Sequence, residues 1–242
     1  MITKTPPPAI AQARITLQAI AGRLDLSTAT VSLALRGSPL VADSTRALVQ
    51  RMAREMGYSY NRSAASLRTA RTNMIGVGFH DITNPYFAEL LTAIEETATA
   101  QGRTILLGTY GESLDRQSRV LATLSEYRPD GMVLCPAGGS ATETYAGLGN
   151  AGIPIVQVSR EIAGAGLDFV GSDDALGAEL AMRHLYDLGH RRIAMIGGND
   201  LISTGRARRA GYRRFLEEVG LGVDERLIHA DFGTREAGFT GV

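Results

Sequence analysis

The sequence predicts a small all-α head that contains a helix-turn-helix, followed by an α/β body built on a parallel sheet. Three short helical patterns follow one another within residues 15–56. Buried strand patterns then alternate with helical ones from residue 73 onward. A third observation, an uneven distribution of charge, indicates that the two parts have different tasks.

The three helical patterns are short and closely spaced. The first, residues 17–24, comes directly after Thr16, and the second follows Ser27 and ends at Gly37. Each of these hydroxyls can cap the helix that comes after it. The third pattern covers residues 44–56. Two helices joined by so tight a turn predict a helix-turn-helix packed against the third helix.

The body has the pattern of a parallel sheet with helices on both faces. Pro85 suits the first position of the helix after the first strand. Residues 162–166, Ile-Ala-Gly-Ala-Gly, join two strands without a helix between them, so we expect this segment to cross between two sub-domains. Strands are expected at residues 74–79, 104–107, 131–134, 153–158, 168–171, 192–196 and 227–230.

Composition excludes several classes of protein. Of 242 residues, 44% are hydrophobic and 21% are charged, which indicates a folded chain rather than a disordered one. One cysteine, Cys135, excludes a disulfide framework and a multi-cysteine zinc site. No apolar run is long enough to span a bilayer, and residues 1–14 lack the apolar core of a secretory signal. The expected location is the cytoplasm.

The net charge of zero hides a strong asymmetry. Residues 1–72 hold ten Lys and Arg against three Asp and Glu, whereas residues 73–242 hold fifteen against twenty-two. A basic head on an acidic body suggests that the head contacts a polyanion. Chance clustering of arginines on a solvated face is the alternative.

The second helix carries the strongest functional signal. In a helix-turn-helix, this helix lies in the DNA major groove with its N-terminal side chains at the base edges. Val31 and Leu35 are expected to point into the core, which leaves Thr28, Ala29, Ser32 and Leu33 outward. Thr30 and Ser32 could donate to phosphates. Nearby positive charge would come from Arg14, Arg36, Arg46, Arg51 and Arg54. A helical bundle used only for protein contacts is the alternative.

Residues 61–68 form a small, basic segment with one large apolar side chain, Leu67. The segment has too little apolar surface to fold alone but could become helical against DNA, with Leu67 as a wedge between base steps in the minor groove. Alternatively, Leu67 packs on the body and the arginines are solvated.

Four segments of the chain stand in a distinctive order: residues 15–37, 61–68, 81–87 (Asp-Ile-Thr-Asn-Pro-Tyr-Phe) and 188–193 (Leu-Gly-His-Arg-Arg-Ile). Together they resemble the lactose-repressor/galactose-repressor (LacI/GalR) family of bacterial transcription factors. The resemblance implies a helix-turn-helix, a hinge helix and a periplasmic-binding-protein-like effector domain of two sub-domains. It also implies a homodimer on a palindromic operator, with a small molecule, often a sugar or nucleobase, that changes DNA affinity.

The resemblance assigns base-reading positions to Thr28, Ala29 and Leu33 and the minor-groove wedge to Leu67. Leu33 stands where many members have an arginine that grips guanine, so only apolar contact, for instance to a thymine methyl, is expected there. Asp25 replaces a usual glycine in the turn but tolerates the left-handed conformation, and Tyr60 replaces a usual proline. The predicted DNA-binding set is Thr16, Ser27, Thr28, Ala29, Thr30, Ser32, Leu33, Arg36, Asn61, Arg62, Ala64 and Leu67.

The family's ligand pocket lies between the sub-domains at the carboxyl ends of strands. Aromatic faces and a few donors suit a neutral polar ligand. Alternatively, Phe87 belongs to the core, and Arg160 and Arg208 are ion-paired with Asp173 or Asp174. The predicted effector-binding set is Asp81, Asn84, Tyr86, Phe87, Ser159, Arg160, Thr204 and Arg208.

No catalytic, cofactor or metal site is predicted. Residues 147–152 fit G-x-G-x-x-G but precede a strand, whereas phosphate binding needs a following helix, so this segment is interpreted as a loop. Cys135 is expected to be an inert core thiol. His80 and Asp81 are adjacent on the chain and should point to opposite faces.

The expected organisation is a disordered tail (residues 1–14), a helix-turn-helix domain (15–60), a hinge (61–72) and two sub-domains (73–166 and 167–242). The second sub-domain is incomplete compared with the family's effector domain, which makes a truncated product, a partial record or a shortened variant possible. The predicted function is an effector-responsive, DNA-binding repressor. The alternatives are a solute-binding protein of the same body fold, an enzyme on this scaffold, or a remnant that keeps only DNA binding.

Overall fold

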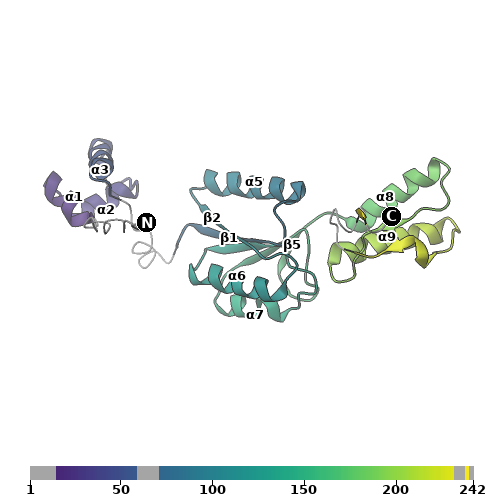
Figure 1. The fold of residues 1–242 in the computed structure, drawn as a ribbon. Helices are drawn as coiled ribbons and strands as arrows, with labels where there is room; N and C mark the ends of the chain where they lie inside the picture. The colour runs from purple at the N-terminus through teal and green to yellow at the C-terminus, as the bar shows by residue number, and fades with distance from the viewer. Residues whose placement is uncertain (1–14, 59–70, 232–237, 240–242) are drawn as a thin grey trace, which may run out of the picture. The chain divides into compact units, whose positions relative to one another are not determined.

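The computed structural model describes residues 15–58, 71–231 and 238–239. The chain forms two compact units, with the division between Thr69 and Ala70. We call them the helical unit and the α/β unit (Figure 1). The expected hinge falls mostly outside the described residues, as do Asn61, Arg62, Ala64 and Leu67. Their roles remain predictions.

The helical unit consists of α1 (Leu17–Leu24), α2 (Thr28–Leu35) and α3 (Asp43–Glu55). The predicted caps are present: Thr16 Oγ1 accepts from the Ala19 amide at 3.2 Å, and Ser27 Oγ accepts from the Thr30 amide at 3.0 Å. Asp25 ends α1 in the left-handed conformation, with φ of 52°. The predicted helix-turn-helix is therefore confirmed.

Apolar side chains from all three helices form the core of the helical unit. Ile20, Val31, Ala34 and Val49 are fully buried. The expected outward position of Ser32 is wrong, because its side chain is only 4% exposed. Both α1 and α3 pack against α2, so the buried face of α2 is wider than the stripe that Val31 and Leu35 predict.

A five-stranded parallel sheet with strand order β2-β1-β3-β4-β5 organises the first part of the α/β unit. Helix α5 covers one face, and α6 and α7 cover the other (Figure 1). Phe87 of α5 packs with the strand residue Phe79 in one buried cluster, and Leu121 of α6 packs with the strand residue Leu134 in another. The elements are β1 (Met74–Phe79), α5 (Pro85–Ala100), β2 (Thr104–Thr109), α6 (Leu114–Glu126), β3 (Gly131–Leu134), α7 (Glu143–Asn150), β4 (Ile155–Val158) and β5 (Asp168–Val170).

Two sequence interpretations need correction here. Residues 162–166 connect β4 to β5, which pair in parallel, so they do not cross between sub-domains. The chain leaves the sheet only after Val170, where residues 171–173 lead into the next helix. The segment with the G-x-G-x-x-G spacing is also no loop, because residues 147–150 form the last turn of α7. The buried side chains of Tyr145 and Leu148 pack α7 on the core, which outweighs the low helix propensity of its glycines.

The rest of the α/β unit contains α8 (Asp174–Asp187), β6 (Met195–Ile196), α9 (Ser203–Glu218), η1 (Glu225–Leu227) and β7 (Ile228–His229). Strands β6 and β7 pair in parallel and are only two residues each, shorter than predicted. Phe215, Tyr212 and Met182 hold α8 against α9. The two helices meet closely at Gly211, where an added Cβ would lie 2.2 Å from the Ala175 carbonyl oxygen.

Candidate functional sites

The N-terminal end of α2 presents small side chains to solvent. Thr28 and Ala29 are exposed, and Leu33 is half-buried against the core. Thr30 Oγ1 lies 2.9 Å from Ser27 Oγ, so these hydroxyls already contact each other. Helix α2 could enter a groove on this side without steric obstruction from a large side chain. Of the predicted base-reading positions, Thr28 and Ala29 are the most accessible.

The arginines of the helical unit divide into two groups. Arg36, Arg51 and Arg54 are exposed at the surface, where arginines can contact phosphates. Arg36 Nε also donates to the Ser32 carbonyl at 3.2 Å, and Arg51 Nε lies 3.9 Å from Glu55 Oε1. Arg46 instead shapes the loop before α3, donating from Nη2 to the Ser38 and Val41 carbonyls at 3.1 and 3.0 Å. Its Nη1 also pairs with Asp43 at 2.8 Å. We therefore interpret Arg46 as structural.

A cavity of about 290 Å³ lies at the carboxyl edge of the five-stranded sheet. Its wall includes residues that follow the ends of β1, β4 and β5, together with the first turns of α8 and α9. In open parallel sheets, ligands bind at this edge. We call it the edge cavity, and its lining residues are His80, Asn84, Tyr86, Phe87, Ser159, Arg160, Ser172, Asp174, Ile202, Thr204 and Arg208.

Of the predicted effector-binding set, every residue except Asp81 lines this cavity. Asp81 was expected to face it, but its carboxylate accepts from the amide and hydroxyl of Thr83, both at 2.7 Å. These hydrogen bonds hold the pKa of Asp81 below its usual value and shape the loop before α5. The sequence reasoning missed His80, Ser172, Asp174 and Ile202. For His80 and Ser172, the available signal was their position directly after a strand.

Aromatic side chains form one side of the edge cavity. Tyr86 is 48% exposed and meets Phe87 edge to face, with ring centroids 5.0 Å apart. Phe87 also packs on Phe79 and on the His80 ring. Phe87 therefore belongs to the core and lines the cavity as well, and Tyr86 is the ring most open to a ligand.

Arg160 is a buried cation held by a carboxylate. Its Nη1 donates to both Glu112 carboxylate oxygens, at 2.9 and 3.1 Å, and to the Pro136 carbonyl at 3.3 Å. The Arg160 side chain is 8% exposed and that of Glu112 is 26% exposed. The sequence left open a pair with Asp173 or Asp174, and the structure shows Glu112 instead.

Arg208 pairs with Asp174, as one of the sequence alternatives proposed. Its Nε and Nη2 both lie 2.7 Å from Asp174 Oδ1. Thr204, one turn earlier on α9, is buried and lines the same cavity. Both arginines of the edge cavity thus carry a carboxylate partner, which makes the cavity polar without a large net charge.

His80 closes the wall behind Phe87. Its Nδ1 lies 3.5 Å from Cys135 Sγ, a contact that the sequence did not predict. Burial, with the charge of Arg160, lowers the pKa of His80 to about 4, although Glu112 and Asp81 act in the opposite direction. Burial raises the pKa of Cys135 to about 12. At neutral pH the pair is an uncharged imidazole beside a thiol, so Cys135 is not an activated nucleophile.

Ser159 has a strained backbone where β4 meets the cavity. Its φ is 63°, a region that non-glycine residues rarely adopt. The Arg160 amide donates to the Val158 carbonyl at 2.6 Å, which closes a tight turn centred on Ser159. The turn directs the chain back along the sheet edge, where Arg160 meets Glu112. Strain of this kind is common at binding sites.

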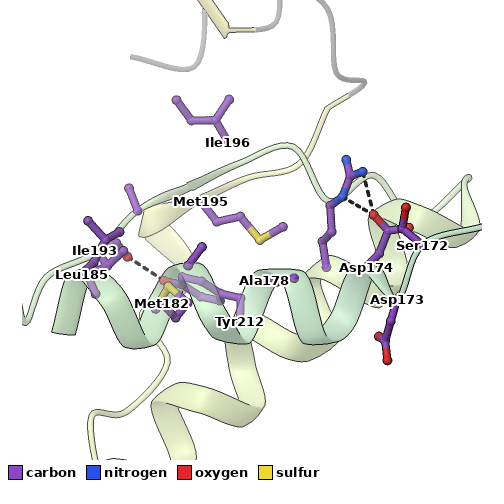
Figure 2. Close-up of a pocket in the computed structure, with 14 residues that line it drawn as sticks. Ser172, Asp173, Asp174, Ala178, Met182, Leu185, Ile193, Met195, Ile196 and Tyr212 are labelled. Atoms are coloured by element: carbon purple, nitrogen blue, oxygen red, sulfur yellow. Dashed lines mark hydrogen bonds and ion pairs between the residues drawn. The ribbon is translucent and has the colours of Figure 1, made fainter. Parts of the chain in front are cut away.

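A larger, mainly apolar cavity of about 510 Å³ lies between α8, α9 and β6. Met195 and Ile196 lie across it from Ala178 and Met182, and the Tyr212 hydroxyl donates to the Ile193 carbonyl at 2.8 Å (Figure 2). Ser172, Asp174 and Arg208 line this cavity and the edge cavity alike. The Arg208–Asp174 ion pair therefore belongs to both.

Within residues 15–58 and 71–231, no cluster of three or more His, Cys, Asp or Glu side chains could hold a metal ion. In the same part of the chain, no helix is long and apolar enough to cross a membrane.

A helix-turn-helix in one unit and a polar cavity at a sheet edge in the other are the parts expected of a DNA-binding regulator with a separate ligand-binding part. Family models match both units: "Bacterial regulatory proteins, lacI family" over residues 16–61, and "Periplasmic binding proteins and sugar binding domain of LacI family" over residues 72–240. The chain belongs to the LacI family.

Similar proteins include the HTH-type transcriptional regulator DegA of Bacillus subtilis, 31% identical over 93% of this chain and 69% of its own length. The ribose operon repressor of Haemophilus influenzae is 31% identical over 94% of this chain and 68% of its own length. The repressor PurR of Erwinia tasmaniensis is 33% identical, over 90% and 64%. The chain thus spans about two thirds of the length of these relatives.

Solved structures show the same fold. The lac repressor dimer bound to operator and the anti-inducer ONPF matches with a TM-score of 0.78 at 20% identity, over 94% of this chain and 68% of that chain. A LacI-family regulator from Silicibacter pomeroyi matches with a TM-score of 0.72 at 26% identity, over 91% and 65%.

Proposed function

We propose that this chain is a cytoplasmic repressor that binds a palindromic operator as a homodimer and responds to a small effector in the edge cavity. The observation that carries the proposal is the convergence of seven predicted effector-binding residues on one cavity in the α/β unit. Family membership supports the DNA-binding part. The lac repressor, whose fold this chain shares, is described as a dimer on its operator.

Thr28, Ala29 and Leu33 are the proposed base-reading residues. The short side chains of Thr28 and Ala29 let α2 lie deep in the major groove, and Leu33 offers apolar contact to a thymine methyl. Selection of duplexes from a random pool should recover a palindromic site. The affinity of the protein for this site should fall steeply as the salt concentration rises, because the arginine contacts to phosphate release counterions. Recovery of no sequence preference at low salt would overturn the proposal.

Leu67 is proposed to be the minor-groove wedge. Leu67→Ala should weaken binding to the selected operator much more than binding to a scrambled duplex, because a wedge acts only where the DNA is bent. A gel-shift titration on both duplexes measures this difference. Equal losses on the two duplexes would contradict the role.

The proposed effector is a neutral, polar ring compound such as a sugar or related metabolite. Tyr86 supplies a ring face, and Asn84, Thr204 and the two paired arginines supply hydrogen-bond donors. Relatives are described as a ribose operon repressor and a maltose regulon regulatory protein, so ribose and maltose are suitable first probes, followed by other sugars and nucleobases. Calorimetric titration of the full chain measures binding.

Effector and operator binding should be reciprocal. A compound that binds the edge cavity must change operator affinity by the same factor by which operator DNA changes affinity for that compound. Tyr86→Ala should abolish the effect of the compound and leave the operator affinity of the ligand-free protein unchanged. A matched control is Tyr127→Ala, which removes an exposed tyrosine at the end of α6.

Relatives are described as transcriptional regulators and repressors, which supports a non-enzymatic role. His80 and Cys135, which contact each other, are in their uncharged forms at neutral pH, so Cys135 is not an activated nucleophile.

A further inference from the structure

Glu112 connects the carboxyl ends of four strands. It follows β2, accepts from Arg160 after β4, and accepts from the Gly138 amide after β3 at 2.7 Å. Its Oε1 also lies 3.8 Å from His80 Nε2, after β1. Glu112 itself does not line the edge cavity and acts from behind Arg160.

The contacts of Arg160 leave part of its guanidinium free. Among the described residues, every hydrogen bond that the Arg160 guanidinium donates uses Nη1, so Nη2 and Nε remain for a ligand. Its positive charge, however, is already balanced by Glu112. The other arginine of the cavity, Arg208, is balanced by Asp174. Asp81 is turned toward Thr83, and His80 is uncharged at neutral pH.

We propose that Glu112 is a positioning and specificity-determining residue, which holds Arg160 in place and cancels its charge so that the edge cavity excludes anionic ligands. An anion in the cavity would give up its hydration while facing a cation whose charge Glu112 already satisfies. A neutral ligand can still accept hydrogen bonds from Nη2 and Nε. The proposal rests on the edge cavity being the effector site, but its main test needs no effector.

Removing the charge of Glu112 should convert the cavity into an anion site. Glu112→Gln keeps the shape of the side chain and an acceptor for Arg160, but it leaves a buried guanidinium without a counter-charge. Inorganic sulfate is the probe. At constant ionic strength, replacing chloride with sulfate should raise the melting temperature of the α/β unit in the Glu112→Gln full chain. The wild-type chain should show at least a tenfold weaker response to sulfate.

The imidazole of His80 gives a second readout that a general loss of packing would not produce. Glu112 raises the pKa of His80, so Glu112→Gln should move the NMR titration of His80 to lower pH. Bound sulfate should move it back. Asp115→Asn is the matched control, because Asp115 also pairs with an arginine, Arg119, but both side chains are exposed. This variant should behave as wild type in both measurements.

Glu112→Gln could unfold, and a double variant keeps the proposal testable in that case. Glu112→Gln with Arg160→Gln removes both charges, so it should melt at a higher temperature than the single variant and lose the response to sulfate. Sulfate binding that persists in the double variant would overturn the proposal. So would equal stabilisation of wild type and Glu112→Gln by sulfate.

Measurements on the wild-type chain and the Glu112→Gln variant distinguish failure of this proposal from failure of the proposed function. Neutral compounds could fail to change operator binding in wild type while sulfate still binds to the Glu112→Gln variant. That result would leave the charge role of Glu112 intact and remove the effector role of the cavity. The reverse pattern would keep the effector site and remove the role of Glu112.

Discussion

The helical unit and the edge cavity position their exposed side chains in different ways. In the helical unit, contacts between residues close in sequence set the N-terminal end of α2: Ser27 caps Thr30, and Asp25 turns the chain. In the edge cavity, the position of Arg160 depends on Glu112, 48 residues earlier. The surface of α2 therefore depends only on a few neighbouring residues, so substitutions elsewhere in the chain should not disturb it. The Arg160–Glu112 ion pair instead makes the cavity wall depend on the whole sheet.

The largest expected difference between the units concerns their cores. Ile20→Ala removes a fully buried side chain from a core made by three short helices. The loss is about 3 kcal/mol, which is comparable to the total stability of a domain this small. Calorimetry should show the transition of the helical unit lost and that of the α/β unit unchanged. Leu40→Ala, at an 84% exposed position, should change neither.

Acid should destabilise the α/β unit through His80. Because the pKa of His80 is about 4 in the folded state and 6.5 as its ordinary value, the unfolded chain takes up the proton first as pH falls. The stabilising contribution is complete above pH 6.5 and is lost toward pH 4. At about 1.4 kcal/mol for each pKa unit, the contribution amounts to about 3 kcal/mol.

Urea unfolding of wild type and His80→Gln at several pH values measures this contribution as the difference between the two curves. The exposed His184 offers the control His184→Gln, which should follow wild type. The helical unit contains no histidine, so its stability should not show this difference. Parallel curves for His80→Gln and wild type would contradict the prediction.

Loss of a cap should have a moderate effect confined to the helical unit. Ser27→Ala removes the acceptor for the Thr30 amide at the start of α2. The expected cost is about 1 kcal/mol, together with weaker operator binding. Ser44→Ala, an exposed serine in the first turn of α3, is the control. A Ser27→Ala protein that melts like wild type would show that local capping does not set α2.

The smallest expected effects come from two residues with positive φ. Asp25→Gly should stabilise the helical unit by about 0.5 kcal/mol, because glycine adopts the left-handed conformation without steric cost. Ser159→Gly should likewise stabilise the α/β unit by about 1 kcal/mol. It should also weaken effector binding, because a glycine turn directs Arg160 less strictly. Melting curves and calorimetric titration measure the two effects.

Most of the fold followed from local patterns in the sequence. The caps Thr16 and Ser27, the turn at Asp25, the start of α5 at Pro85 and the strands of the five-stranded sheet all depend on residues within a few positions of one another. Cavity residues such as Asn84 and Ser159 were predicted from the family resemblance, which places them in loops that follow strands. Parallel strands place their carboxyl ends at one edge.

Features that depend on distant partners were not predictable. Glu112 lies in a loop without any motif, and only the sheet brings it to Arg160. Ser32 is buried because α1 and α3 both cover α2, which the period of α2 alone does not show. The role of residues 162–166 was misjudged because a helix-free connection fits a crossover and a same-sheet link equally well, and only strand pairing decides between them.

The close approach of α8 and α9 at Gly211 has an evolutionary consequence. Any side chain there would collide with the main chain at Ala175 and force the helices apart, and with them Asp174 and Arg208, which sit on the two helices. In a library randomised at position 211 and screened for repression, we expect glycine alone to survive, so this residue should serve as a fixed reference point when distant members are aligned.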